Sequence, residues 1–264
     1  MTQDERRRFL LEFLLRERGE TMALPGDEAA QRRLLRALCN VREPVPAPAD
    51  FLAVQDAYLQ EETRRKGVTD AARIPEAEPG VRLWRGDITT LRCDAIVNAA
   101  NSALLGCFVP CHGCIDNAIH TYAGVQLRLA CAELMAAQGH PEPAGRAKIT
   151  PAFNLPSRYV LHTVGPIVRN RPTARDEALL AACYRSCLAL AAAHGARSVA
   201  FCCISTGEFH FPNQEAAELA VQTVTDVLSH STSIRKVIFN VFKDLDAELY
   251  RGLLGQPEPA AGRP

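Results

Sequence analysis

The sequence lacks any long apolar run. Among its 264 residues no uninterrupted apolar stretch reaches the length of about 18 residues that a membrane-spanning helix requires. The first residues, MTQDERRRFLLEFLLRERGE, also lack the apolar core and small-residue cleavage site of a signal peptide. Both absences predict a cytoplasmic protein without a membrane partner.

The chain also has a formal net charge of zero. Lys and Arg together number 30, and Asp and Glu together number 30. A neutral chain gives no bulk-charge reason to bind nucleic acid or anionic lipid, so we expect neither partner. The length suits one large α/β domain with an appendage or two small domains, and the 47% of apolar residues can form a substantial core.

Two common nucleotide-binding motifs are absent. The chain contains neither GxGxxG nor GxxxxGK[ST], which excludes the usual dinucleotide-binding turn and the P-loop. Cysteine, in contrast, is plentiful, with ten residues. In a reducing compartment these are more often buried thiols or metal ligands than disulfides. Four of them lie in an Ala/Leu-rich helix or an apolar strand, and we expect them to pack in the core: Cys183, Cys187, Cys202 and Cys203.

The chain divides near residue 75. Residues 3–66 have the apolar stripe of three amphipathic helices, and the Pro-bearing segment VTDAARIPEAEPG follows. We therefore predict a helical extension at 1–75, a main domain at 76–255 and a disordered tail at 256–264. Apolar segments predict strands at 81–84, 95–98, 147–149, 158–162, 198–204 and 236–242. Helices are predicted at 115–138, 177–194, 214–229 and 246–254.

This alternation of strands and helices predicts an α/β fold with a largely parallel, covered sheet. Ligands of such folds bind at the carboxyl ends of strands. Three loops follow predicted strands: GDITTL at 86–91, NAANSALLGCFVPCHGC at 98–114 and STGEFHFPN at 205–213. Backbone N–H groups in a loop like the third can bind phosphate, although a plain strand-to-helix turn has the same pattern.

The second loop contains a candidate metal site. Cys107, His112 and Cys114 offer two thiolates and one imidazole, which suit Zn²⁺. Three protein ligands leave a fourth position open, as in catalytic zinc sites. Cys111 is an alternative fourth ligand, but we expect it to point away, and we expect His120 to pack behind the site. Chance clustering in a cysteine-rich chain is the other interpretation.

Five motifs occur in the order found in macrodomains, the ADP-ribose-binding family. They are GDIT, DAIVNAANSALLG, IDNAIH, LHTVGP and ISTGEFHFP, and the resemblance spans roughly residues 80 to 250. It implies a three-layer α/β/α fold with a mixed, mostly parallel sheet, here with an N-terminal helical extension. It also implies that ADP-ribose binds in a cleft at the crest of the sheet.

The sequence departs from most macrodomains in one loop. CFVPCHGC replaces the glycine-rich run that usually follows NAAN. That replacement and the helical extension resemble the zinc-dependent macrodomains, whose microbial members are associated with sirtuin-type ADP-ribosyltransferases and remove the modification that those enzymes add. The resemblance implies a monomeric hydrolase acting on mono-ADP-ribosylated protein, with Zn²⁺ as cofactor.

The resemblance also implies roles for single residues. Asp87 accepts from the adenine amino group, and the Ile88 N–H faces the adenine ring. Asn101 reaches the distal ribose and is the expected catalytic residue. The diphosphate is expected between two further segments, made of Ile115, Asp116 and Asn117 and of Ser205, Thr206, Gly207, Glu208 and Phe209. Asp116 has an equally good interpretation as a charge at a helix start.

Two other functions use the same pocket. The chain could be a non-catalytic ADP-ribose-binding module with a structural zinc, or it could act on free ADP-ribose derivatives as a phosphatase or deacetylase. Recognition alone needs no Lewis acid, so an open zinc site favours the hydrolase. Whether the zinc acidifies a water molecule or polarises the substrate stays open at this point.

Overall fold

The computed structural model describes residues 1–230 and 232–256. The tail predicted at 256–264 lies outside this part of the chain, apart from Gln256. The division at residue 75 also stays a prediction.

A seven-stranded mixed sheet forms the centre of the molecule. Its strand order is β2-β3-β9-β8-β5-β7-β6; the five inner strands are parallel, and the two edge strands run antiparallel to their neighbours. The strands are β2 (Glu76–Glu78), β3 (Val81–Arg85), β5 (Ala95–Ala99), β6 (Ala147–Pro151), β7 (Tyr159–Thr163), β8 (Ser198–Phe201) and β9 (Lys236–Val241). A separate parallel pair joins β1 (Thr69–Asp70) to β4 (Leu91–Arg92).

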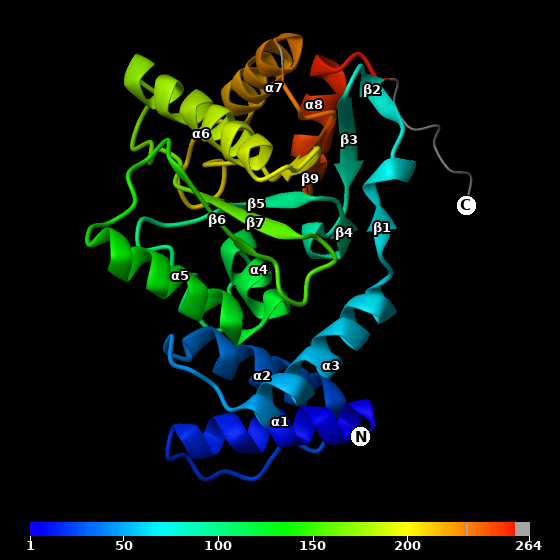
Figure 1. Ribbon diagram of the computed structural model, residues 1–264, viewed down its shortest axis with the longest axis vertical. Coiled ribbons are helices and arrows are strands. Elements are labelled where there is room, and N and C mark those ends of the chain that lie inside the picture. Colours follow the sequence, from blue (N-terminus) through cyan, green and yellow to red (C-terminus); the bar gives the residue numbers. More distant parts are fainter. Residues whose placement is uncertain (231, 257–264) are drawn as a thin grey trace.

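Helices cover both faces of the sheet (Figure 1). One face packs against α4 (Ile115–Ala123) and α5 (Val125–Gln138), and the other against α6 (Ala174–Ala193), α7 (Asn213–Ser229) and α8 (Asp244–Leu253). The predicted three-layer arrangement is confirmed. The single helix predicted at 115–138 is wrong, because Gly124 has a φ of 97° and separates α4 from α5. Glycine tolerates this backbone conformation, whereas other residues are strained in it.

The three central strands are mostly apolar on both faces, as expected for a covered parallel sheet. β5, β8 and β9 are almost entirely buried and contribute to one large core. Cys183, Cys187 and Cys202 are buried, as predicted from the sequence. Cys203 is only half-buried, and β8 ends at Phe201 rather than at 204.

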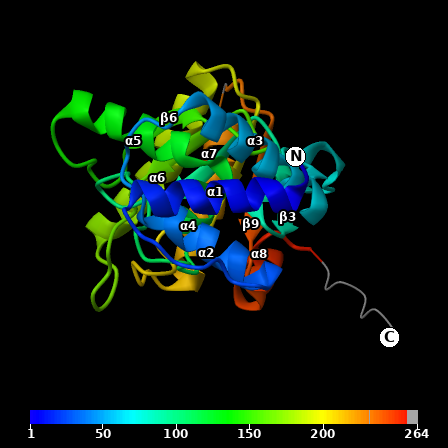
Figure 2. The ribbon, with the colours of Figure 1, turned by 90° about the horizontal axis from the view of Figure 1, so that it is seen from below.

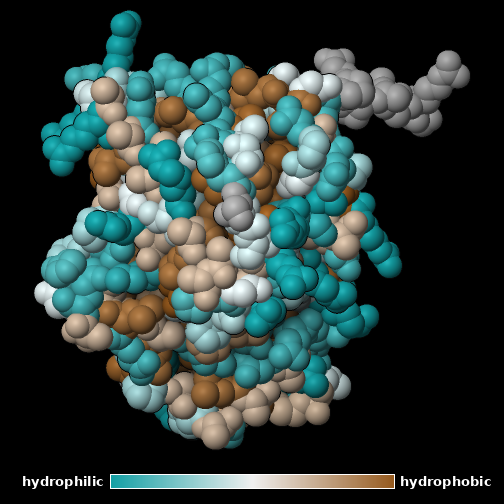
Figure 3. All heavy atoms as spheres, turned by 45° about the horizontal axis from the view of Figure 1, so that its top comes forward, coloured by the Kyte–Doolittle hydropathy of each residue, from teal (hydrophilic) through white to brown (hydrophobic). Residues whose placement is uncertain are grey.

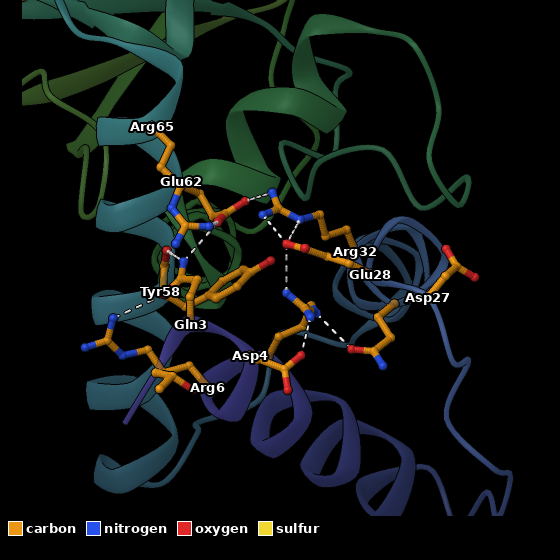
Figure 4. Close-up of polar contacts among 12 residues, drawn as sticks. Gln3, Asp4, Arg6, Asp27, Glu28, Arg32, Tyr58, Glu62 and Arg65 are labelled. Carbon is orange, nitrogen blue, oxygen red and sulfur yellow. Dashed lines mark hydrogen bonds and ion pairs between the residues drawn. The ribbon is translucent and has the colours of Figure 1, made fainter.

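Three helices precede the sheet and form a unit with its own small core. They are α1 (Gln3–Glu17), α2 (Glu28–Val41) and α3 (Ala49–Lys66). Figures 1 and 2 both place this unit beneath α4 and α5, with α1 on the outside. Polar contacts between the helices add to the apolar core: Gln3 donates to the Tyr58 carbonyl at 2.8 Å, and Arg32 pairs with Glu62 (Figure 4).

On the face shown in Figure 3, hydrophilic side chains surround smaller hydrophobic patches. Within the described residues, no helix has the length and apolar composition needed to cross a membrane.

Candidate functional site

A cleft of about 940 Å³ lies at the carboxyl ends of the parallel strands. Its walls come from the segments that follow β3, β5, β8 and β9 and from the first turn of α4. The volume is at the upper end of the range of about 300–1,000 Å³ for small-molecule pockets. The strand-end rule therefore located the cleft from the sequence.

Cys107, His112 and Cys114 meet at one end of this cleft. Their potential ligand atoms all lie within 4.8 Å of one another, and each residue is half-buried. The Cys107 Sγ lies 3.6 Å from the His112 Nδ1. Ligand bonds of about 2.3 Å and 2.0 Å at a tetrahedral angle place sulfur and nitrogen about 3.5 Å apart. The donor types and their spacing therefore fit a metal ion such as zinc.

Cys111 stays outside this cluster. It has a φ of 56°, and its Sγ lies 3.4 Å from the Arg33 carbonyl of α2. The left-handed backbone at Cys111 turns the loop between Cys107 and His112. This conformation costs about 1–2 kcal/mol for a residue other than glycine. We call residues 107–114 the metal loop. Phe108 and Val109 of this loop are exposed, and Phe108 lines the cleft.

The first turn of α4 completes this end of the cleft. Cys114 is the N-cap residue, and its Sγ accepts a hydrogen bond from the Asn117 N–H at 3.4 Å. Burial raises the pKa of the Cys114 thiol to about 12, although this hydrogen bond works against the increase. Burial also raises the pKa of Asp116 to about 6, although Asn98 donates to that carboxylate at 2.8 Å.

A second group of metal-binding residue types lies deeper in the fold. His120, Cys131 and His162 are buried, and their potential ligand atoms lie within 4.8 Å of one another. His162 has hydrogen-bond partners at both ring nitrogens, Asn98 at 3.2 Å and Thr150 at 3.0 Å. Burial lowers the pKa of His162 to about 4 and that of His120 well below its usual value. The His120 ring contacts Gly106, directly before the metal loop, closely enough to leave no room for a Cβ. Packing rather than metal ligation stays the prediction for His120.

Asp87 and Ile88 lie at the opposite end of the cleft, directly after β3. The Lys66 ammonium at the end of α3 donates to the Asp87 Oδ2 at 2.8 Å, and Thr89 donates to the Oδ1. Burial alone raises the pKa of Asp87, but the hydrogen bonds from Lys66 and Thr89 outweigh burial and hold the pKa below its usual value. Asp87 is therefore an ionised acceptor at neutral pH.

The loop at 205–209 forms the middle wall. Ser205 has a left-handed φ of 66°, and its buried Oγ has no hydrogen-bond partner within the described protein. Gly165 approaches so closely that a Cβ there would lie 1.9 Å from the Ser205 Oγ. At the far end of this loop, the Glu208 carboxylate lies 3.7 Å from the His112 Nε2. If His112 holds a metal ion, a carboxylate at this position is of the kind that commonly orients a ligating imidazole.

Most of the predicted site residues line the same cleft. Those that line the cleft are Asp87, Ile88, Asn101, Cys107, His112, Cys114, Ile115, Asp116, Ser205, Thr206, Gly207, Glu208 and Phe209. Asn117 does not line it: its buried side chain donates to the Val109 carbonyl at 3.0 Å and accepts from Arg36. Asn101 donates to the Gly106 carbonyl at 3.1 Å, so one of its two amide hydrogens stays available for a ligand.

Several residues of the cleft were missed from the sequence. Arg36 and Lys66 come from the helical extension, and Phe242 and Lys243 follow β9. Phe242 is 73% exposed in spite of its apolar side chain. The apolar segment 236–242 predicts Phe242 as the last residue of a strand, whereas β9 ends at Val241. Nothing in the sequence pattern placed the two helical residues in the cleft.

Comparisons with known proteins agree with this geometry. A family model described as Macro domain matches residues 97–220. A Treponema medium protein named Protein-ADP-ribose hydrolase is 56% identical over 260 residues, covering 96% of this chain and all of its own. A Staphylococcus aureus protein of the same name is 49% identical over 92% of each chain. A Trypanosoma brucei macrodomain in complex with ADP-ribose superposes with a TM-score of 0.64 at 29% identity, covering 83% of this chain and 95% of its own.

Proposed function

The chain belongs to the macrodomain family, and we propose that it is a metal-dependent hydrolase that removes mono-ADP-ribose from modified proteins. Its relatives along nearly the full length carry the name Protein-ADP-ribose hydrolase, and this chain is an enzyme of that class. The finer points are the metal, which we take to be Zn²⁺, and the modification, which we take to be the one added by sirtuin-type transferases. The Cys and His donors of the metal loop support the choice of Zn²⁺. The resemblance of this loop and of the helical extension to the zinc-dependent macrodomains supports the type of modification.

The observation that carries the proposal is the position of the Cys107, His112 and Cys114 donors in the cleft wall. Structural zinc sites normally have four protein ligands, whereas catalytic sites have three. A zinc ion bound there would supply Lewis acidity, either to a water molecule or to an oxygen of the substrate. A pure recognition module has no use for such an open position.

The remaining residues bind and orient the substrate. Asp87 is ionised and can accept a hydrogen bond from the adenine amino group at the end of the cleft opposite the metal loop. The unpartnered Ser205 Oγ and the backbone of the 205–209 loop can bind the diphosphate, together with the N-terminus of α4. Asn101, at the base of the metal loop, can then donate to the distal ribose.

This orientation brings the anomeric carbon, to which the acceptor protein is attached, towards the metal loop. Phe108 is exposed and lines the cleft on the side where the modified protein would approach, and the adjacent Val109 is exposed as well. We further propose that the enzyme acts in the cytoplasm as a monomer.

Incubation of the purified protein with a mono-ADP-ribosylated protein tests the proposal. We expect release of ADP-ribose that a chelator abolishes and that added Zn²⁺ restores. Tight binding of ADP-ribose without release by the zinc-loaded protein would instead identify a binding module.

A further inference from the structure

The metal loop has little structure of its own. Among residues 107–113, all of which the structure describes, one backbone–backbone hydrogen bond joins two loop residues, from the His112 N–H to the Val109 carbonyl at 3.2 Å. A loop that holds metal ligands must keep them in a fixed relative position. Side chains from elsewhere must therefore supply the order.

Arg36 of α2 supplies one set of contacts. Its guanidinium donates to the His112 carbonyl at 2.8 Å and to the Asn117 Oδ1 at 2.7 Å. Asn117 in turn donates to the Val109 carbonyl at 3.0 Å. The planar fork of one arginine thus fixes the backbone of a ligand residue and, through Asn117, the opposite side of the turn.

Asn40, one helical turn further along α2, supplies the second set. Its Oδ1 accepts from the Cys111 N–H at 2.9 Å, and its Nδ2 donates to Thr121 of α4 at 3.0 Å. Asn40 is only 1% exposed, so this amide is shielded from water. The contact falls at the left-handed residue of the loop, where the chain reverses between the ligands Cys107 and His112.

α2 contacts α1, α3 and α5. Gln31 and Arg32 contact Arg7 of α1 and Glu62 of α3, the latter ion pair being visible in Figure 4. At its other end, the Cys39 carbonyl accepts from Arg128 of α5, whose guanidinium stacks 4.2 Å from the Phe108 ring centroid in the metal loop. The loop is therefore packed against a rigid helix unit.

We infer that Arg36 and Asn40 are positioning residues for the metal loop, so that α2 of the N-terminal helices is part of the apparatus that sets the metal site. The expected effect of these residues on turnover rests on the proposed function. Their expected effect on loop order does not, because the contacts join protein groups only.

Four variants test this role: Arg36→Ala, Arg36→Lys, Asn40→Ala and Asn40→Asp. Arg33→Ala is the matched control, because it removes an exposed arginine from the same helix and leaves the Arg33 carbonyl in place. Three quantities are measured on each folded variant: hydrogen exchange of the metal-loop amides, Zn²⁺ affinity by chelator competition, and kcat beside KM for hydrolysis.

We expect Asn40→Ala to abolish protection of the Cys111 amide and Asn40→Asp, which keeps the acceptor, to retain most of it. Both alanine variants should lose about 10- to 100-fold in zinc affinity and in kcat, the usual effect of removing groups that orient metal ligands. KM should change much less, because the far end of the cleft is untouched. Arg36→Lys should lose nearly as much zinc affinity and kcat as Arg36→Ala, since an ammonium lacks the planar fork.

Unchanged loop exchange and unchanged zinc affinity in both alanine variants would overturn the inference, whether or not the wild-type protein hydrolyses anything. Loss of loop protection with wild-type kcat would also overturn it, because the order would then serve no catalytic purpose. If the wild-type protein shows no hydrolysis but the variants lose loop protection and zinc affinity, the proposed function fails and the positioning role stands.

Discussion

The ammonium of Lys66, the last residue of α3, lies 2.8 Å from the Asp87 Oδ2 at the end of the cleft away from the metal loop. The pair joins the N-terminal helices to the residue that we expect to recognise adenine. It also determines how the carboxyl titrates, because the hydrogen bond from Lys66 is the largest of the contacts that lower the pKa of Asp87.

Lys66→Met should therefore raise the pKa of Asp87. A carboxyl with a lowered folded pKa contributes stability above its unfolded pKa and loses it as the pH falls through the folded value. In the variant that loss should occur at a higher pH. Carbon-13 NMR titration of the Asp87 carboxyl measures the shift, with Arg65→Met as a control at the neighbouring position. An unchanged titration curve would contradict the pairing.

Asp87→Ala should weaken ADP-ribose binding. A hydrogen bond to a charged group contributes roughly 1.5–3 kcal/mol, which corresponds to about 10- to 150-fold in Kd. Calorimetric titration measures it, and Asp226→Ala, an exposed carboxylate on α7, is the control. Equal affinities of the wild type and the Asp87 variant would remove Asp87 from the adenine site.

Metal content should follow the three donors of the metal loop. Elemental analysis should find about one zinc per chain, and less after Cys107→Ser, His112→Ala or Cys114→Ser. Cys111→Ser is the matched control, because this thiol lies in the same loop but faces the Arg33 carbonyl. Full zinc in all three site variants would refute the assignment, and loss of zinc in the control would add Cys111 to the ligands.

Gly165→Ala should disturb the middle of the cleft. The new Cβ would lie 1.9 Å from the Ser205 Oγ, so the Ser205 side chain or its loop must move. We expect a loss of stability of about 1–3 kcal/mol, typical of overpacking, and weaker ADP-ribose binding. Thermal unfolding and calorimetry measure both, and Gly252→Ala, whose Cβ meets no atom within 4 Å, is the control. Wild-type binding by Gly165→Ala would show that the position of Ser205 is unimportant.

The sheet and the clustering of Cys107, His112 and Cys114 were predictable because both are local patterns. The ligands Cys107, His112 and Cys114 lie within one loop, and each apolar run forms a strand by its own composition. The break at Gly124 was not predictable, since a single glycine within a helical pattern is often tolerated. There the Cβ-free residue also faces the Gln55 side chain of α3, a contact between segments distant in sequence.

The contribution of the N-terminal helices to the site could not be predicted from the sequence either, because it also depends on contacts between distant segments. Arg36 and His112 are separated by 76 positions, and Asn40 and Cys111 by 71. Amphipathic periodicity identifies the buried stripe of a helix but not which loop its polar residues will contact. Arg36 and Asn40 consequently looked like ordinary polar residues of a surface helix.

The central claim is that the metal held by Cys107, His112 and Cys114 acts in the chemical step. A metal that only braced the loop would support ligand binding and turnover together. A metal acting at the anomeric end contributes several kcal/mol to transition-state stabilisation and little to binding of the adenine end.

The most direct test is single-turnover release of ADP-ribose by His112→Ala, measured beside an ADP-ribose binding titration and the Tm of the same variant. We predict that release slows by at least about a thousandfold while affinity falls far less and the fold persists. Parallel losses of rate and affinity would contradict a chemical role and leave the metal as a brace. Near-normal release without bound metal would show that these three residues are not the catalytic centre.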